Sequence, residues 1–248
     1  DEASAIATFS ALQDGVKDAD TASHVFLAIV HLSRGELDSA SDSVEQLVER
    51  QPRNLVARNL QATLAIARGD YDRARDLLAQ ILRQRSDFQP ALVNRLRLQT
   101  LEKRFDHASV TAAQLQSTSP NAPIVLLELA RFDLARGDRD AAIAGLQRFH
   151  ETDPQAVEPG LDLVSLYLQS GWHDAAAKVV ERLRDARPDN WRVLMASARV
   201  HLASADLKSA RLVLSDAQRQ SNRDPQRTIA VARLYQRAFA PELAIGVL

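Results

Sequence analysis

The stretch VEPGLDLVSLYLQSGWHDAAAKVVERLRDARPDN, residues 157–190, reads as two helices joined by a tight turn. Apolar residues recur at steps of three and four on both sides of Gly171, the spacing that places them on one face of a helix. Ser170 and Gly171 supply the turn, since glycine tolerates a positive φ, and Pro188 ends the second helix. The apolar stripe of the first helix is Leu161, Leu163, Val164, Tyr167 and Leu168, and that of the second is Ala175, Ala176, Val179, Val180 and Leu183.

This pattern recurs with one period along the chain. Gly35 and Gly69 are 34 residues apart, as are Gly137 and Gly171. A proline stands twelve residues beyond an alanine in four units, and Ser86 and Asn222 replace it in two. The period predicts an array of helix pairs that stack on their neighbours. The alanines in register are Ala40, Ala74, Ala108, Ala142, Ala176, Ala210 and Ala244, and the prolines are Pro52, Pro120, Pro154 and Pro188.

The unbroken alanine position has a physical reason. Where the two helices of a pair cross most closely, a methyl group fits, and a larger side chain would force the helix axes apart. We therefore expect all seven alanines to lie at the crossings.

Composition agrees with an all-helical protein. Alanine and leucine, both good helix formers, are the commonest residues, and only 8 Gly and 9 Pro are present among 248 residues. The net charge of −1 gives no overall attraction to nucleic acid. Because there is no cysteine, a thiol nucleophile, a thiolate metal site and a disulfide framework are all excluded.

The period, the turn glycine, the crossing alanine and the terminal proline together resemble the tetratricopeptide repeat (TPR) family. The resemblance implies an all-α, right-handed superhelical solenoid of antiparallel helix pairs, with first helices lining a concave groove. It places residues 1–20 as a degenerate preceding helix and residues 21–248 as the solenoid, whose seventh unit is truncated. The units are expected to begin at Thr21, Leu55, Gln89, Pro123, Val157, Trp191 and Pro225.

Shorter strings carry a narrower resemblance. The run Ala57–Ala62 leading to Gly69 and Asp70, the run Phe88–Asn94, and the stretch from Pro159 to Leu168 look like TPR lipoproteins of bacterial PEP-CTERM exopolysaccharide and protein-sorting systems. This resemblance implies a lipid-anchored scaffold on the periplasmic side of the envelope, with its signal and acylated cysteine outside this chain. The alternatives are a cytoplasmic peptide-binding adapter or regulator, and the TPR arm of a larger enzyme such as a glycosyltransferase.

The candidate binding residues lie on one face of the first helices, at the ninth position and at nearby positions. Four of the seven residues at the ninth position are arginine, and guanidinium groups in a row suit carboxylates. Pairing of these arginines with carboxylates of adjacent helices, such as Glu128 and Asp162, is an equally strong interpretation. The candidate groove residues are Asn59, Thr63, Asn94, Arg97, Glu128, Arg131, Asp162, Arg199 and Arg233, and the ninth position is completed by Ile29 and Ser165. We expect protein or peptide partners, with acidic segments among the candidates, no nucleic acid, and membrane contact only through the lipid anchor.

Signatures of common enzymes are missing. The sequence contains no phosphate-binding glycine loop, no G-x-S-x-G and no H-E-x-x-H, so we expect no catalysis, no cofactor and no metal. Two RGD tripeptides, residues 68–70 and 136–138, fall on the expected turns, where glycine and a polar residue are structural. The aromatic residues Tyr71, Phe105 and Trp172 stand beside turns and are expected to pack between helices.

Overall fold

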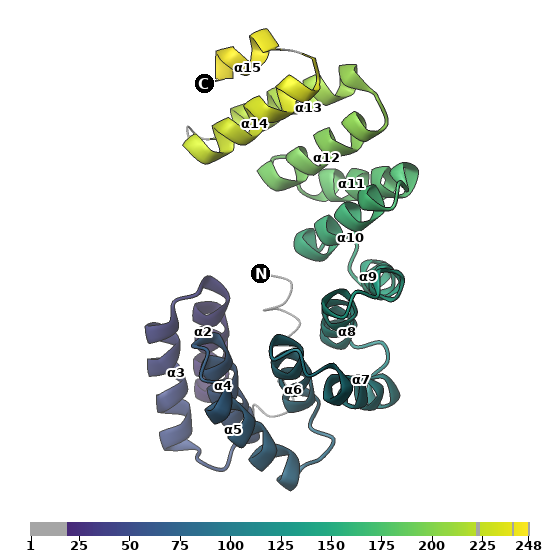
Figure 1. Ribbon diagram of the computed structural model, residues 1–248. Coiled ribbons are helices and arrows are strands. Elements are labelled where there is room, and N and C mark those ends of the chain that lie inside the picture. Colours follow the sequence, from purple (N-terminus) through teal and green to yellow (C-terminus); the bar gives the residue numbers. More distant parts are fainter. Residues whose placement is uncertain (1–18, 222–223, 240, 248) are drawn as a thin grey trace. The chain divides into compact units, whose positions relative to one another are not determined.

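The computed structural model describes residues 19–221, 224–239 and 241–247, and all regular structure in these ranges is α-helical (Figure 1). Residues 1–18 of the expected preceding helix lie outside the described residues, and α2 begins at Ala19. The helices are α2 (Ala19–Arg34), α3 (Leu37–Arg50), α4 (Leu55–Ala67), α5 (Tyr71–Gln84), α6 (Gln89–Leu101), α7 (Phe105–Thr118), α8 (Pro123–Ala135), α9 (Arg139–Thr152), α10 (Val157–Gln169), α11 (His173–Ala186), α12 (Trp191–Ala203), α13 (Leu207–Arg219), α14 (Pro225–Arg237) and α15 (Pro241–Val247).

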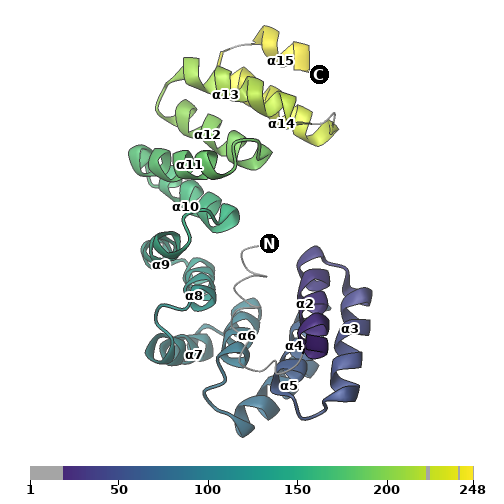
Figure 2. The same ribbon diagram turned by 180° about the vertical axis from the view of Figure 1, so that it is seen from behind.

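Consecutive helices form antiparallel pairs, a first helix of even number followed by a second helix of odd number (Figures 1 and 2). The expected all-helical fold of stacked pairs is confirmed. Each described helix is too short or too polar to cross a membrane.

The chain divides into two compact units, one ending at Gly145 and one beginning at Leu146. In the first unit α2 contacts α4, α4 contacts α6, and α6 contacts α8, so first helices lie side by side. In the second unit α10 contacts α12 and α12 contacts α14 in the same way. Each unit has its own apolar core, which includes Leu60, Leu92 and Leu115 in the first unit and Leu194, Leu214 and Tyr235 in the second.

The crossing alanines are all buried. Six of them have no exposed surface, and Ala244 has 1%. Two glycines also lie where the neighbouring helix leaves little space, because a Cβ built on Gly145 would stand 3.2 Å from the Cβ of Ala130, and one on Gly160 would stand 2.9 Å from a methyl carbon of Leu183. A side chain larger than a methyl group therefore has no room at these crossings.

The turns between paired helices use a left-handed residue. Gly35, Gly69, Gly137 and Gly171 have φ between +75° and +88°. In the three units that lack the glycine, the turn keeps the same backbone, with positive φ at Lys103, Ala205 and Phe239. The turn thus keeps its backbone conformation where glycine is replaced, although a positive φ is unfavourable for residues that have a Cβ.

A substitution at one crossing tests the packing. Ala142→Leu should lower the free energy of unfolding by about 1–3 kcal/mol, because the larger side chain overpacks the crossing. Ala144→Leu, on the exposed side of the same helix, is the matched control and should be nearly neutral. Urea unfolding of both variants provides the measurement, and equal stability of the two would contradict the assigned crossing.

Candidate functional site

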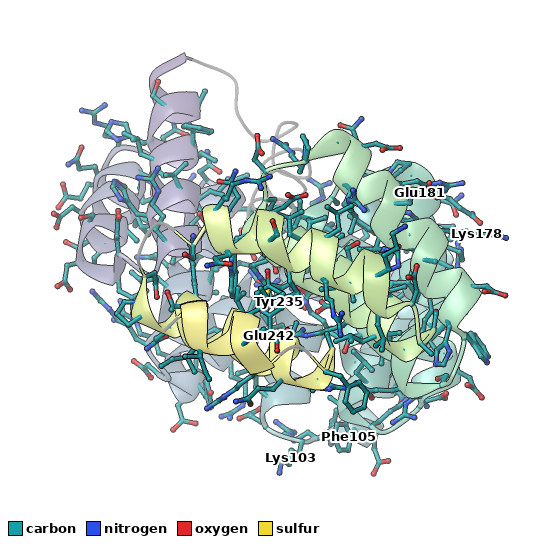
Figure 3. All side chains as sticks on the ribbon, turned by 90° about the horizontal axis from the view of Figure 1, so that it is seen from above. Lys103, Phe105, Lys178, Glu181, Tyr235 and Glu242 are labelled. Carbon is teal, nitrogen blue, oxygen red and sulfur yellow. The ribbon has the colours of Figure 1, made fainter. Side chains whose placement is uncertain are left out.

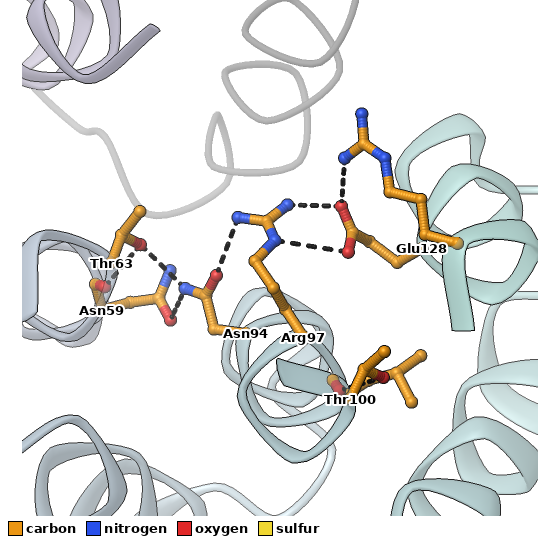
Figure 4. A network of polar contacts seen from close by, with 8 residues as sticks. Asn59, Thr63, Asn94, Arg97, Thr100 and Glu128 are labelled. Carbon is orange, nitrogen blue, oxygen red and sulfur yellow. Dashed lines mark hydrogen bonds and ion pairs between the residues drawn. The ribbon is translucent and has the colours of Figure 1, made fainter. Parts of the chain in front are cut away.

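A chain of polar side chains runs across the neighbouring first helices α4, α6 and α8 (Figure 4). Asn59, Asn94 and Glu128, one from each helix, are buried, with at most 4% of each residue exposed. Burying such groups costs free energy unless they are hydrogen-bonded. Each of these three buried side chains forms hydrogen bonds with a neighbouring first helix.

The amide end of the chain joins α4 to α6. Asn94 Nδ2 donates to Asn59 Oδ1 at 3.0 Å and to Thr63 Oγ1 at 2.8 Å. The Thr63 hydroxyl in turn donates to the backbone carbonyl of Asn59 at 3.0 Å. These contacts fix the rotamer of Asn94 and orient its Oδ1 toward Arg97, whose Nη1 lies 3.5 Å away.

The charged end joins α6 to α8. Arg97 donates through Nη2 to Glu128 Oε1 and through Nε to Glu128 Oε2, the latter at 3.2 Å, so the contact is bidentate. Arg131, three residues along α8, donates from Nη1 to the same Oε1 at 2.7 Å. Two guanidinium groups thus share one carboxylate.

Electrostatics favours the ionised form of Glu128. Burial by itself raises the pKa of this carboxyl, but the charges and hydrogen bonds of Arg97 and Arg131 outweigh burial and hold the pKa below its usual range. The charge of Glu128 raises the pKa of Arg97 in return. The pairing is therefore part of the packing of α6 against α8, as the internal-pairing interpretation of the sequence expected.

The remaining candidate residues lie in the second unit. Asp162 of α10, Arg199 of α12 and Arg233 of α14 are exposed. The sixth position, which holds Glu128 in α8, is occupied by Ala196 in α12 and Ala230 in α14. Arg199 and Arg233 therefore lack the carboxylate that engages Arg97 and Arg131.

The second unit contains a polar cleft that the sequence pattern did not predict. The cleft has a volume of about 490 Å³ and lies among α11, α12 and α13. Gln220 Nε2 donates to Asp189 Oδ1 at 3.1 Å at its edge, and Arg219 pairs with Asp216. The residues that line the cleft do not share one position of the repeat, so the repeat pattern could not predict it. The charged lining residues are Glu181, Arg184, Asp185, Asp189, Asp216 and Arg219.

The other motifs are structural. Asp70 and Asp138, the last residues of the two RGD tripeptides, accept hydrogen bonds from the backbone N–H of Arg73 and Ala141 and thereby cap α5 and α9. Among the described residues, no group of three or more histidine or acidic side chains could hold a metal ion. Trp172 is 48% exposed, with its ring centroid 5.7 Å from that of Tyr167, so it packs on only one side.

Comparison with sequence families agrees with this architecture. Tetratricopeptide repeat models match residues 27–90, 133–190 and 167–234. The chain belongs to the tetratricopeptide repeat family. No functionally curated protein matches this TPR chain by sequence.

Solved structures share the TPR fold at low sequence identity. The pilF protein of Pseudomonas aeruginosa is 15% identical, with a TM-score of 0.64 over 88% of this chain and 97% of that one. PilW, described as a widely conserved type IV pilus biogenesis factor, is 17% identical, with a TM-score of 0.63 over 82% and 94%. YrrB, described as a TPR protein with an unusual peptide-binding site, is 12% identical, with a TM-score of 0.55 over 81% and 97%.

The buried ion pair of this TPR chain supports a stability prediction. Glu128→Gln should lower the free energy of unfolding by about 2 kcal/mol, because Arg97 loses its carboxylate in a half-buried site. The contribution of Glu128 is present above the ordinary carboxyl pKa of 4.5 and is lost as the pH falls through the lowered pKa of the folded state. Urea titrations at several pH values measure both effects. Glu181→Gln, at an exposed position of α11 (Figure 3), is the control, and an equal loss in both variants would contradict the assignment.

A second titratable group, His150, is held in its neutral form by the fold, whereas Glu128 is held in its charged form. His150 of α9 is 6% exposed, and neither ring nitrogen has a hydrogen-bond partner among the residues that the structure describes. Burial, and then the charge of Arg182, lowers the pKa of His150 below its usual 6.5, while Asp153 opposes the shift. The folded state therefore holds the neutral ring, and unfolding takes up a proton below that pH.

Stability of the wild-type chain should accordingly fall as the pH drops below 6.5, and His150→Leu should reduce that fall. Thermal unfolding followed by circular dichroism across this pH range provides the measurement. His107→Leu, at an exposed position, serves as the control. An unchanged pH dependence in His150→Leu would show that the ring does not control it.

Proposed function

We propose that this chain is a non-catalytic scaffold that binds protein segments within an assembly of the bacterial cell envelope. TPR proteins are generally protein-interaction scaffolds, and membership of this family is the observation that carries the binding role. The exposed first-helix residues of the second unit, Arg199 and Arg233, offer polar groups for such contacts.

Two arguments support an envelope role. The fold likeness includes pilF and PilW, the second of which is described as a type IV pilus biogenesis factor, and pili are assembled at the cell surface. The short strings shared with PEP-CTERM lipoproteins favour the periplasmic side and a role with exopolysaccharide export or protein sorting. The peptide-binding description of YrrB supports a peptide segment as the form in which a partner is bound.

Localisation of the full-length protein tests the proposal. An epitope-tagged copy should remain with the envelope fraction and become protease-sensitive when the outer membrane is opened, while a cytoplasmic marker stays protected. Crosslinking in intact cells followed by mass spectrometry should then recover envelope proteins. A protease-protected protein with cytoplasmic partners would favour the adapter. A catalytic domain in the same polypeptide would favour the arm of a larger enzyme.

A further inference from the structure

The first helices α12 and α14 of the second unit carry basic residues and no acidic ones. By contrast, α10 in the same unit contains Glu158 and Asp162. The face that α12 and α14 contribute is thus cationic, although the whole chain has a net charge of −1. The arginines of the two helices are Arg192, Arg199, Arg227, Arg233 and Arg237.

Two of these arginines are engaged within the protein. Arg192 forms an ion pair with Glu158. Arg227 lies 3.8 Å from Asp224 and stacks over the ring of Trp191, with 5.4 Å between its Cζ and the ring centroid. Their charges are compensated or screened locally.

The other three arginines, Arg199, Arg233 and Arg237, are exposed, and none has a hydrogen-bond or ion-pair partner within the part of the chain that the structure describes. The cause can be traced to the repeat. In α8 the sixth-position Glu128 accepts from Arg131 and from Arg97 of the preceding first helix. In α12 and α14 that position is Ala196 and Ala230, so the ninth-position residues Arg199 and Arg233 have no such carboxylate beside them.

The spacing of these groups suits an extended chain. Helices in contact, as α12 and α14 are, have axes about 8–10 Å apart, and Arg233 and Arg237 are four residues apart on one face of α14, or about 6 Å along it. In an extended peptide, side chains two or three residues apart are separated by about 7–10 Å. Carboxylates at such intervals can therefore meet guanidinium groups on both helices, with paired hydrogen bonds at each.

One neighbouring residue favours a protein ligand over a phosphate polymer. Ile229, one turn before Arg233, is 43% exposed and lies on the same face of α14. An apolar side chain beside the guanidinium groups offers a contact to a peptide side chain that a phosphate backbone does not use.

We propose that Arg199, Arg233 and Arg237, with Ile229 beside them, form a docking surface for an extended acidic segment of a partner protein. The proposal rests on the scaffold function above and assigns it a location and a ligand chemistry. Arg97 and Arg131 are not part of this surface, because Glu128 engages them.

A defined peptide tests this surface. The probe is a labelled nine-residue peptide that alternates glutamate and serine around a central leucine, and fluorescence anisotropy at low ionic strength measures its binding to the complete chain. A peptide with glutamine in place of each glutamate should bind far more weakly. Arg199→Glu combined with Arg233→Glu and Arg237→Glu should weaken binding of the acidic peptide by at least about tenfold.

The matched control changes the charge by the same amount elsewhere. Lys178→Glu, Arg187→Glu and Lys208→Glu together reverse three exposed basic residues on or beside the second helices, and Figure 3 shows Lys178 on the outer side of α11. This variant should bind the acidic peptide nearly as well as wild type. Far-UV circular dichroism should show unchanged helicity in both variants.

Several results would overturn the surface. They are no binding of the acidic peptide by the wild-type chain, equal weakening in the control variant, equal binding of the glutamine peptide, and tighter binding of a thymidine oligonucleotide of equal charge. If envelope partners crosslink normally to the Arg199, Arg233 and Arg237 variant, the scaffold function stands and the surface fails. If the peptide binds as expected but the protein is cytoplasmic, the surface stands and the envelope role fails.

Discussion

The close crossing of paired helices is the constraint on which the rest of this structure depends. Alanine at each crossing lets two helix backbones approach until only a methyl group separates them, and all seven alanines are buried. At Gly145, against Ala130, and at Gly160, against Leu183, even an added methyl group would be crowded. Since core packing tolerates little change in volume, this contact fixes the separation within each pair, and the left-handed turn residue fixes its direction.

Because each helix pair has the same geometry, residues at equivalent positions of neighbouring repeats lie side by side. This is why Asn94 can reach Asn59 and Thr63 of α4, and why Arg97 can reach Glu128 of α8. The same lattice places Arg199 and Arg233 on neighbouring first helices where the acidic position holds alanine. One geometry therefore yields an internally satisfied network in one unit and exposed guanidinium groups in the other.

The sequence predicted the helix pairs well, because apolar spacing, turn glycines and terminal prolines act locally. It also selected the residues of the polar chain, since they share repeat positions. It left open whether the arginines bind a ligand or pair internally, because that depends on lateral neighbours about 31 residues away, as for Arg97 and Glu128. It gave no indication that Trp172 would be half exposed, or that His150 would be buried with no hydrogen-bond partner in the described part of the chain.

The sequence by itself determined the period, the all-helical architecture and the family, because these follow from residue types at fixed local spacing. Only the tertiary structure shows which charged side chains form ion pairs within the protein. Glu128 is shared by Arg97 and Arg131, whereas Arg199, Arg233 and Arg237 are exposed. The physical reason is that an ion pair needs a carboxylate beside the guanidinium group, and packing between helices decides which residues are neighbours. Glu128 lies against Arg97 and Arg131, whereas the equivalent position beside Arg199 and Arg233 holds Ala196 and Ala230.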